Sequence, residues 1–320
     1  MKGIIIGIGS IGKRHLKNFK KFPIEILSFS KHQNSTKKDK SLDLCLSEKY
    51  DFGLVTNVTN LHTSTSIKLA KSNSHIFIEK PLSNSLLNLK ILEKLVNEKN
   101  LITLIGCNLR FHPCLIKIKN LLSQKILGKI IFVQAEHGSY LPNWHPNEDY
   151  KKSYAGRKEL GGGVVLTSIH EIDYLYWLFG DIVEVYSQSG NFSNLKINAE
   201  DYSATLLKFK NGIVGELHLD YFQHPSSRKC KIVGTKGTII WDYNQNLVKL
   251  FDNKTNKWNI ILKLNSFDIN STYVDEISHF LSCIKQNKKT INSLHDGIKT
   301  LKISLAILKS SVKKKAVKIK

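Results

Sequence analysis

The sequence predicts an α/β domain with a doubly wound parallel sheet, followed by an α+β domain with a large, mainly antiparallel sheet. A glycine-rich turn follows a short apolar strand near residue 7, and strand and helix signals then alternate up to about residue 110. From about residue 182, strand signals follow one another without helices between them. A chain of 320 residues suits two domains, which we expect at residues 1–120 and 121–320.

The glycine-rich turn has the spacing of a phosphate-binding loop. Ile4 to Ile6 form a β-branched run suited to a buried parallel strand, and the segment from Gly7 to Gly12 reads G-x-G-x-x-G. The first glycine permits the tight turn, the second lets a pyrophosphate approach the backbone, and the third lets helix and strand pack closely. We predict dinucleotide binding here, with a purely structural glycine turn as the alternative.

The end of the second predicted strand, Ile24 to Phe29, bears on the choice of cofactor. An NAD site places Asp or Glu there to bind the ribose hydroxyl, whereas this chain has Ser30 and Lys31. A hydroxyl and a cation can receive a 2′-phosphate, so the sequence favours NADP over NAD. The alternative is an ordinary polar loop that lacks the acid for unrelated reasons.

Polar residues also follow the next strands. Predicted strands at 51–58 and 75–78 lead into Asn57 and into Lys80 of an E-K-P tripeptide. In open α/β sheets, ligands bind at the carboxyl ends of the strands. We therefore expect Ser30, Asn57 and Lys80 at the same edge of the sheet as the glycine turn.

The segment from Gly161 to Gly180 predicts one apolar helix that carries polar groups. Thr167, His170 and Asp173 recur at helical spacing and are expected along one face that enters a cleft. Histidine suits proton transfer because its unperturbed pKa is about 6.5. The alternative is a core histidine bonded to a backbone carbonyl, with Asp173 capping a neighbour. Glu171 is expected on another face, in a salt bridge, and the last glycine is expected to cap the helix.

Residues 108–157 contain further candidates for substrate contacts. Arg110 could hold a carboxylate or phosphate bidentately, or it could join the two domains. The loop at 140–157 is rich in Trp, His and Tyr, whose rings suit the apolar faces of a sugar. About half of the loop candidates are expected to be structural. The candidates in this region are Asn108, Arg110, Trp144, His145, Tyr154 and Arg157.

The second half of the chain predicts an antiparallel sheet. Strand signals occur at 128–137, 182–189, 204–209, 213–219, 229–234 and 237–242, with a hairpin signal at Asn211-Gly212. Such a sheet can pack one face on helices and offer the other to a partner subunit. Segments 273–284 and 296–310 predict closing helices.

Composition narrows the class of protein. Lys and Arg number 48 against 26 Asp and Glu, a net charge of +22, which reflects either a codon bias toward Lys, Asn and Ile or a polyanionic partner. Because the lysines are spread along the whole chain, we expect no nucleic-acid partner. Five cysteines without a C-x-x-C argue against a metal site or a disulfide framework and favour a cytoplasmic location. No run approaches the roughly 18 apolar residues of a membrane helix.

Taken together, these motifs resemble those of the glucose–fructose oxidoreductase and inositol dehydrogenase family (Gfo/Idh/MocA). The resemblance covers nearly the whole chain, through G-x-G-x-x-G, E-K-P, N-L-R-F-H-P at 108–113, the G-G-G…H-x-x-D helix and the segment V-D-E-I-S-H-F near the end. The segment 139–163 also resembles members associated with sugar and surface-polysaccharide metabolism. The resemblance implies a Rossmann domain that binds NAD or NADP and a second domain with the substrate pocket and often the oligomer contact. It also implies hydride transfer between the nicotinamide and a sugar, sugar nucleotide or cyclitol.

The resemblance also implies roles for individual residues and an assembly state. The family's E-K-P lysine matches Lys80, and its helix histidine matches His170, as proton-transfer candidates. Relatives usually carry Asp one turn before this histidine, where this chain has Thr167. That departure keeps a catalytically idle nucleotide-binding scaffold or sensor as the alternative function. A homodimer or homotetramer is expected.

The expected site residues fall into three groups. For the cofactor they are Gly7, Gly9, Ser10, Ile11, Gly12, Ser30, Lys31, Asn57, His62, Glu79 and Lys80. For catalysis they are Lys80, His170 and Thr167. For the substrate they are Asn108, Arg110, Trp144, His145, Tyr154, Arg157 and Asp173.

Overall fold

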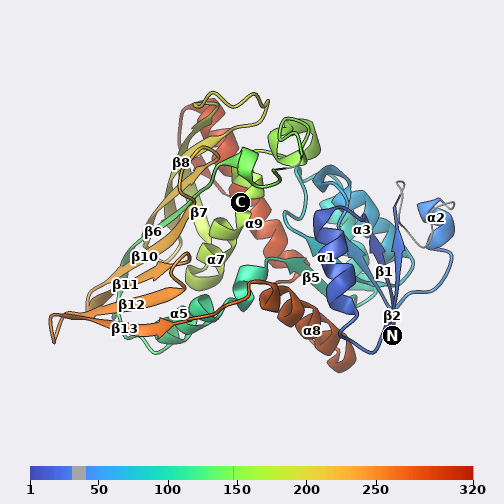
Figure 1. Ribbon diagram of the computed structural model, residues 1–320, viewed down its shortest axis with the longest axis horizontal. Helices are drawn as coiled ribbons and strands as arrows, with labels where there is room; N and C mark the ends of the chain where they lie inside the picture. The colour runs from blue at the N-terminus through green and yellow to red at the C-terminus, as the bar shows by residue number, and fades with distance from the viewer. Residues whose placement is uncertain (31–40, 147, 320) are drawn as a thin grey trace. The chain divides into compact units, whose positions relative to one another are not determined.

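The computed structural model describes residues 1–30, 41–146 and 148–319 (Figure 1). The chain divides into two compact units. Unit 1 comprises Met1–Asn108 and Ile269–Leu301, and unit 2 comprises Leu109–Asp268 and Lys302–Lys320. Within the described residues the strands form two sheets, a parallel one in unit 1 and a mainly antiparallel one in unit 2. The predicted fold class is therefore confirmed.

The parallel sheet of unit 1 has the strand order β2-β1-β3-β4-β5. Every pair of neighbours in it is parallel among the described residues. The chain moves from β1 outward to β2 and then returns to β3 on the other side of β1, so the border of β1 and β3 is a topological switch point, where such sheets bind ligands. The strands are β1 (Lys2–Ile6), β2 (Glu25–Phe29), β3 (Phe52–Val55), β4 (His75–Glu79) and β5 (Thr103–Gly106).

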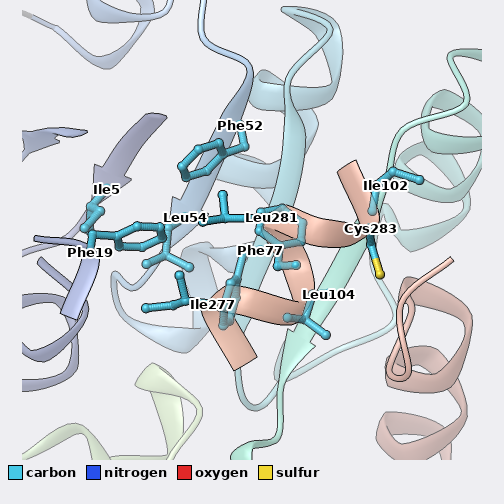
Figure 2. Close-up of a cluster of buried hydrophobic side chains, with 11 residues drawn as sticks. Ile5, Phe19, Phe52, Leu54, Phe77, Ile102, Leu104, Ile277, Leu281 and Cys283 are labelled. Atoms are coloured by element: carbon cyan, nitrogen blue, oxygen red, sulfur yellow. The ribbon is translucent and has the colours of Figure 1, made fainter. Parts of the chain in front are cut away.

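Helices cover both faces of this sheet. On one face, α1 packs with α8, and a row of side chains on neighbouring strands, Ile5, Leu54, Phe77 and Leu104, meets Ile277 of α8 (Figure 2). Burying each such side chain contributes about 1.5–3 kcal/mol. On the other face, Gly53 leaves room for Leu69 of α3, since a Cβ there would collide with the leucine. The helices are α1 (Ser10–Phe19), α2 (Leu42–Cys45), η1 (Thr59–Leu61), α3 (His62–Lys71), α4 (Leu89–Glu98), η2 (Asn108–Phe111), α8 (Asn270–Gln286) and α9 (Leu294–Lys313).

The large sheet of unit 2 has the order β13-β12-β11-β10-β6-β9-β8-β7-β14. Across the described strands its neighbours are antiparallel, except that β6 pairs parallel with β9. The strands are β6 (Ile130–Gly138), β7 (Ile182–Gly190), β8 (Tyr202–Phe209), β9 (Val214–Asp220), β10 (Ser227–Gly234), β11 (Gly237–Asp242), β12 (Leu247–Asp252), β13 (Lys257–Lys263) and β14 (Val317–Lys318).

One face of the large sheet is buried and the other is open. Side chains alternate accordingly along β8, where Leu207 is buried and Leu206 is 52% exposed. Helices α5, α6 and α7 contact the buried side. The covering elements are α5 (Pro113–Ser123), η3 (Leu141–Asn143), η4 (Tyr154–Gly156), η5 (Lys158–Leu160), α6 (Val164–Thr167) and α7 (Ile169–Phe179).

Several local predictions can be compared with the structure directly. The hairpin at Asn211-Gly212 is confirmed, with φ +87° at the glycine, and Gly180 ends α7 with φ +85°. The prediction of one continuous helix after Gly163 is wrong. Ser168, at φ −94° and ψ 35°, separates α6 from α7, so helical spacing does not relate Thr167 to His170. The strand predicted to reach residue 58 ends at Val55, and the hydroxyl of the next residue, Thr56, donates to the Gly7 carbonyl, 2.6 Å away.

Candidate functional site

The glycine turn after β1 forms an open cradle at the N-terminus of α1. Gly7 has φ +107°, which only glycine adopts without strain, and Gly12 must be glycine because a Cβ there would collide with the Gly7 carbonyl oxygen. Gly9 differs, since a Cβ built on it meets no described atom within 4 Å. Ser10 and Ile11 are the first residues of α1, whose described residues include no side-chain cap. Their unpaired N–H groups and the positive end of the helix dipole suit an anion.

The ends of β3 and β4 bring two more predicted cofactor residues close to this turn. Asn57 lies against Gly7, and its amide Nδ2 donates to Thr65 Oγ1 at 2.9 Å, while its buried Oδ1 has no partner among the described residues. His62 lies between two carbonyl oxygens, 2.8 Å from that of Pro81 and 2.9 Å from that of Asn57. Burial lowers the pKa of His62 against the raising effect of these carbonyls, and a neutral ring donates to only one of them.

The E-K-P segment follows β4 directly. Glu79 is buried, and its Oε2 accepts a hydrogen bond from the Lys80 backbone N–H at 3.2 Å. Lys80 itself is half-buried. Ser30 follows β2 at the same edge of the sheet and is half-buried, whereas Lys31 lies outside the described residues. The structure thus brings the glycine turn, Ser30, Asn57 and Lys80 to the carboxyl ends of neighbouring parallel strands.

In unit 2, the two acids of α7 are held by arginines. Arg110 donates from Nε and Nη2 to the two carboxylate oxygens of Asp173 at 2.9 and 2.8 Å, and both side chains are 1% exposed. Arg228 of β10 donates from Nε to Glu171 at 2.7 Å. The predicted salt bridge of Glu171 is confirmed. These pairs fix the orientation of α7, and they direct the Arg110 and Asp173 side chains toward each other.

His170 and Thr167 lie on either side of the helix break. Ser168 forms the break, and its hydroxyl lies 3.0 Å from Nδ1 of His137 on β6. His170 is 9% exposed and Thr167 3%, and Tyr221 lies beside Thr167. The predicted proton-transfer histidine therefore lies in the first turn of α7, a helix tied to the large sheet by Arg228 and, through Ser168 before it, by His137.

The start of α6 is capped by a carboxylate. Glu200 Oε1 accepts a hydrogen bond from the Val165 N–H at 3.2 Å, and Gly163, with φ +104°, leaves the space that this carboxylate occupies. Burial raises the pKa of Glu200 to about 7, although its hydrogen bonds with backbone N–H groups act in the opposite direction. Glu200 is thus an acid with a shifted pKa next to the segment that leads to Thr167.

Of the other predicted substrate residues, Trp144 and Tyr154 lie near Tyr221, the residue beside Thr167. Trp144 donates from Nε1 to Ser139 at 2.8 Å and packs on Tyr221, at 5.4 Å between ring centroids. His145 is exposed and Tyr154 is half-buried at the start of η4. Arg157 forms an exposed ion pair with Glu159. Asn108 belongs to unit 1, where its amide donates to Thr272 at 2.8 Å.

Sequence reasoning missed four residues that shape these sites. His15 contacts Glu79, His137 contacts Ser168, Arg228 pairs with Glu171, and Glu200 caps α6. Each partner lies at least 31 residues away along the chain, so local spacing carries no signal for it. The strand alternation that places His137 and Arg228 opposite each other on β6 and β10 is visible only once the strands are paired.

Among the described residues, no cluster of His, Cys, Asp or Glu has the arrangement of a metal site. In the same part of the chain, none of the helices combines the length and the apolar character required to span a bilayer. The cysteines are all buried and no disulfide joins them across the described ranges.

Comparison with known proteins identifies relatives of similar length. The chain is 25% identical to myo-inositol 2-dehydrogenase of Thermotoga maritima, over 98% of this chain and 97% of the relative. It is 25% identical to the NAD(+)-dependent scyllo-inositol 2-dehydrogenase of Bacillus subtilis, over 81% of this chain and 75% of that protein.

Solved structures share the fold. Levoglucosan dehydrogenase in complex with NADH and levoglucosan superimposes with a TM-score of 0.87 at 18% identity, over 100% of this chain and 99% of that one. At such identity the likeness shows the fold alone.

A family match covers most of the chain. Residues 119–319 match the family described as "Oxidoreductase family, C-terminal alpha/beta domain" of the Gfo/Idh/MocA group. The predicted resemblance is thereby confirmed, and the chain belongs to the Gfo/Idh/MocA oxidoreductase family.

Proposed function

We propose that the protein is an NAD(P)-dependent oxidoreductase that transfers hydride between the nicotinamide and a hydroxyl or keto carbon of a sugar, sugar nucleotide or cyclitol. One observation carries the proposal: the glycine turn, Asn57 and Lys80 follow β1, β3 and β4, which are adjacent parallel strands. Cofactor binding by residues 1–120 and substrate binding by residues 121–320 form part of this proposal, as does a cytoplasmic location.

The residues at the switch point fit a dinucleotide. Gly9 leaves the backbone open to close approach, and the buried Asn57 Oδ1 has no partner among the described residues and can accept a donor from a ligand. The first N–H groups of α1 suit the pyrophosphate. The nicotinamide would supply the hydride, while the protein supplies binding, orientation and proton management.

In this proposal Lys80 and His170 carry out proton transfer. Lys80 holds the substrate hydroxyl and exchanges its proton as hydride leaves or arrives, and His170 is the second proton-transfer residue. Thr167 hydrogen-bonds the substrate but cannot act as a carboxylate base. The ion pairs of Glu171 and Asp173 keep α7, and with it His170, in a fixed orientation.

The names of the relatives support the proposed substrate class. The proposed cofactor, in contrast, rests on residues of this chain. They include dehydrogenases named for inositols and for levoglucosan, and the substrate proposed here is accordingly a polyhydroxylated ring. We propose NADP over NAD because Ser30, and not an acid, follows β2. Lys31, the second residue behind that choice, lies outside the described residues.

Parallel fluorescence titrations with NADPH and NADH test the cofactor assignment. Tighter binding of NADPH is expected, because no carboxylate at Ser30 repels the 2′-phosphate. Tighter binding of NADH would overturn the NADP assignment and leave the enzyme assignment intact. Binding of neither nucleotide would mean that the glycine turn is structural.

Turnover on a panel of cyclitols, sugars and sugar nucleotides tests the roles of the two residues. Lys80→Met and His170→Gln should each lower kcat by about a hundredfold or more, the usual contribution of general acid–base catalysis. Lys94→Met, which alters a lysine with a 74% exposed side chain on α4, is the matched control and should turn over like the parent protein. Turnover that survives both site substitutions would contradict the proposed mechanism.

A catalytically idle nucleotide-binding scaffold is the second candidate function, and the buried Thr167 hydroxyl favours it. The two candidates differ in what Thr167→Asp does. An active enzyme adapted to a hydroxyl should lose kcat, because the change removes that hydroxyl and buries a new charge in its place. An idle scaffold would bind nucleotide and turn over no substrate on the panel. Thr167→Asp would then not lower its kcat, and any gain of activity would come from the new carboxylate.

The open face of the large sheet supports a homodimer or homotetramer. Tyr186 and Leu206 form a cross-strand pair on this face, are 42% and 52% exposed, and line a groove of about 330 Å³. Exposed apolar side chains grouped on a sheet are typical of subunit contacts. Leu206→Glu should shift the mass measured by light scattering toward the monomer, and Lys208→Glu, which alters a neighbouring side chain of β8 that is already charged, is its control. An unchanged mass for Leu206→Glu would place the contact elsewhere.

A further inference from the structure

A buried histidine–carboxylate pair links the first helix to the E-K-P segment. His15 lies on α1, is 0% exposed, and packs edge-on against the rings of Phe77 and Tyr273 at 5.3 and 5.8 Å. Its Nε2 lies 2.5 Å from Glu79 Oε1. Because a carboxylate only accepts hydrogen bonds, Nε2 carries the proton. Nδ1 has no partner among the described residues, which fits an unprotonated nitrogen in an apolar enclosure.

The second oxygen of the same carboxylate reaches the backbone of the lysine. Glu79 Oε2 accepts from the Lys80 N–H at 3.2 Å. The carboxylate lies over Gly106 of the neighbouring strand, where an added Cβ would come within 3.0 Å of it. Glu79 is thus fixed by a histidine on one oxygen, by the lysine backbone on the other, and by a glycine that leaves it room.

Burying the Glu79 carboxylate costs free energy. Taking a carboxylate out of water is unfavourable, and the hydrogen bonds it accepts must offset the lost hydration. Burial, and after it the charge of Glu79, raises the pKa of Tyr273, so the phenol stays protonated beside the carboxylate. The Arg14 guanidinium lies over the Tyr273 ring, 4.8 Å from its centroid, and acts on the Tyr273 pKa in the opposite direction. A purely apolar link between α1 and β4 would hold the helix equally well.

We infer that His15 is a positioning residue for Lys80, acting through the Glu79 carboxylate. The pair connects the helix that follows the glycine turn to the residue that precedes the lysine, so the two parts of the cofactor edge keep one geometry. On the other side of the lysine, His62 contacts the Pro81 carbonyl at 2.8 Å. The inference rests on the proposed function, since it gives Lys80 a reaction for which its position matters.

The test compares His15→Leu and His15→Gln. Leucine removes the donor, whereas glutamine can present an N–H near the position of Nε2. His15→Leu should lower kcat by about tenfold to a hundredfold, the cost of misplacing a reacting group by about 1 Å. NADPH affinity should fall less than kcat, because the glycines of the turn are unaltered. His15→Gln should recover most of the kcat.

Amide hydrogen exchange at Lys80 gives a second readout that needs no substrate. The Lys80 N–H should exchange faster in His15→Leu than in the parent protein and in His15→Gln, since Glu79 is no longer held. His75→Leu is the matched control, because His75 lies at the other end of β4 and accepts from the Ile102 N–H at 2.9 Å. It should destabilise the unit without altering Lys80 exchange or kcat.

The outcomes separate this inference from the proposed function. Unchanged kcat and unchanged Lys80 exchange in His15→Leu would overturn the inference, even if Lys80→Met abolishes turnover. A loss of kcat in His15→Leu that His75→Leu reproduces, or that glutamine does not restore, would also overturn it, because the role would then be structural. If Lys80→Met keeps full turnover, the proposed function fails, and with it the reason to position Lys80.

Discussion

The strand ends of unit 1 and the helix α7 of unit 2 use buried polar groups in opposite ways. In unit 1, Asn57 keeps a buried carbonyl oxygen without a partner in the described structure, beside a glycine turn that leaves its backbone open. In unit 2, both oxygens of Asp173 accept from Arg110, and Glu171 accepts from Arg228. Buried polar groups are nearly always satisfied. The Asn57 oxygen, which lies beside an open backbone, can therefore accept a donor from a ligand, whereas the paired carboxylates of α7 hold that helix in position.

Substitutions at the strand ends of unit 1 and in α7 of unit 2 should therefore have different effects. Changes at the strand ends of unit 1 should alter ligand binding more than folding. Changes in the ion pairs of α7 should alter folding first, because each leaves a charge buried without its partner. The predictions below test that division.

Breaking the Arg110–Asp173 pair should have the largest effect. Arg110→Met leaves the Asp173 carboxylate 1% exposed without its arginine, and such losses cost about 3–5 kcal/mol of unfolding free energy. Urea denaturation followed by tryptophan fluorescence measures it, since Trp177 lies 5.7 Å from the guanidinium.

Arg157→Met is the matched control for this measurement. It removes an ion pair whose side chains are 44% and 50% exposed, and exposed pairs contribute about 0–1 kcal/mol. If Arg110→Met were as mild as the control and instead weakened substrate binding, Arg110 would belong to the binding site and the contrast between the units would be lost.

Alanine at the glycines of the turn should separate folding from binding within unit 1. Gly12→Ala drives a methyl group into the Gly7 carbonyl oxygen, and overpacking of this kind costs about 1–3 kcal/mol. Gly9→Ala meets no described atom, so its unfolding free energy should stay within about 0.5 kcal/mol of the parent.

NADPH affinity, unlike the unfolding free energy, should fall in Gly9→Ala. The methyl group of Gly9→Ala stands where a pyrophosphate approaches the backbone, and NADPH affinity should fall although the fold is intact. Equal NADPH affinity in Gly9→Ala and the parent protein would mean that this backbone does not contact a nucleotide.

The parallel part of the fold was predictable because its signals are local. A glycine turn, strand ends and E-K-P are each read from a few consecutive residues, and parallel topology then gathers them at one edge without further information. The same holds for the Asn211-Gly212 hairpin and for the cap at Gly180, where φ > 0 demands glycine.

The geometry around α7 was not predictable from spacing. Arg110 and Asp173 are 63 residues apart and Arg228 and Glu171 57, so nothing local relates them. The break at Ser168 was missed because serine is compatible with a helix, and its contact with His137 comes from a strand 31 residues earlier. β12, β13 and β14 were not among the predicted strands. β13 lies at the edge of the sheet, and its Trp258 and Ile260 are both exposed.

The smallest effect should come from Glu200, and it depends on pH. Burial raises the pKa of this carboxyl from 4.5 to about 7 in the folded chain. Between these values the folded state binds more protons than the unfolded state, so the unfolding free energy should fall as pH rises and level off above about 7. Glu200→Gln keeps the acceptor for the Val165 N–H and removes the titration. It should therefore be more stable than the parent at pH 8, by about 1–2 kcal/mol, and similar to it at pH 4.

Thermal or urea unfolding of both proteins between pH 4 and 8 measures this difference. Glu159→Gln is the control. The pKa of that exposed carboxyl is lowered to about 2, chiefly by its own backbone N–H and by Asn198. Above about pH 6 it is ionised in both the folded and the unfolded state, so its stability difference should not change between about pH 6 and 8, where Glu200 still titrates. A parent protein that gains stability relative to Glu200→Gln as pH rises would mean that the carboxylate form is the one favoured by the fold. Glu200 would then belong with the satisfied acids of α7, and the glycine turn at 161–163 would hold a permanent charge at the start of α6.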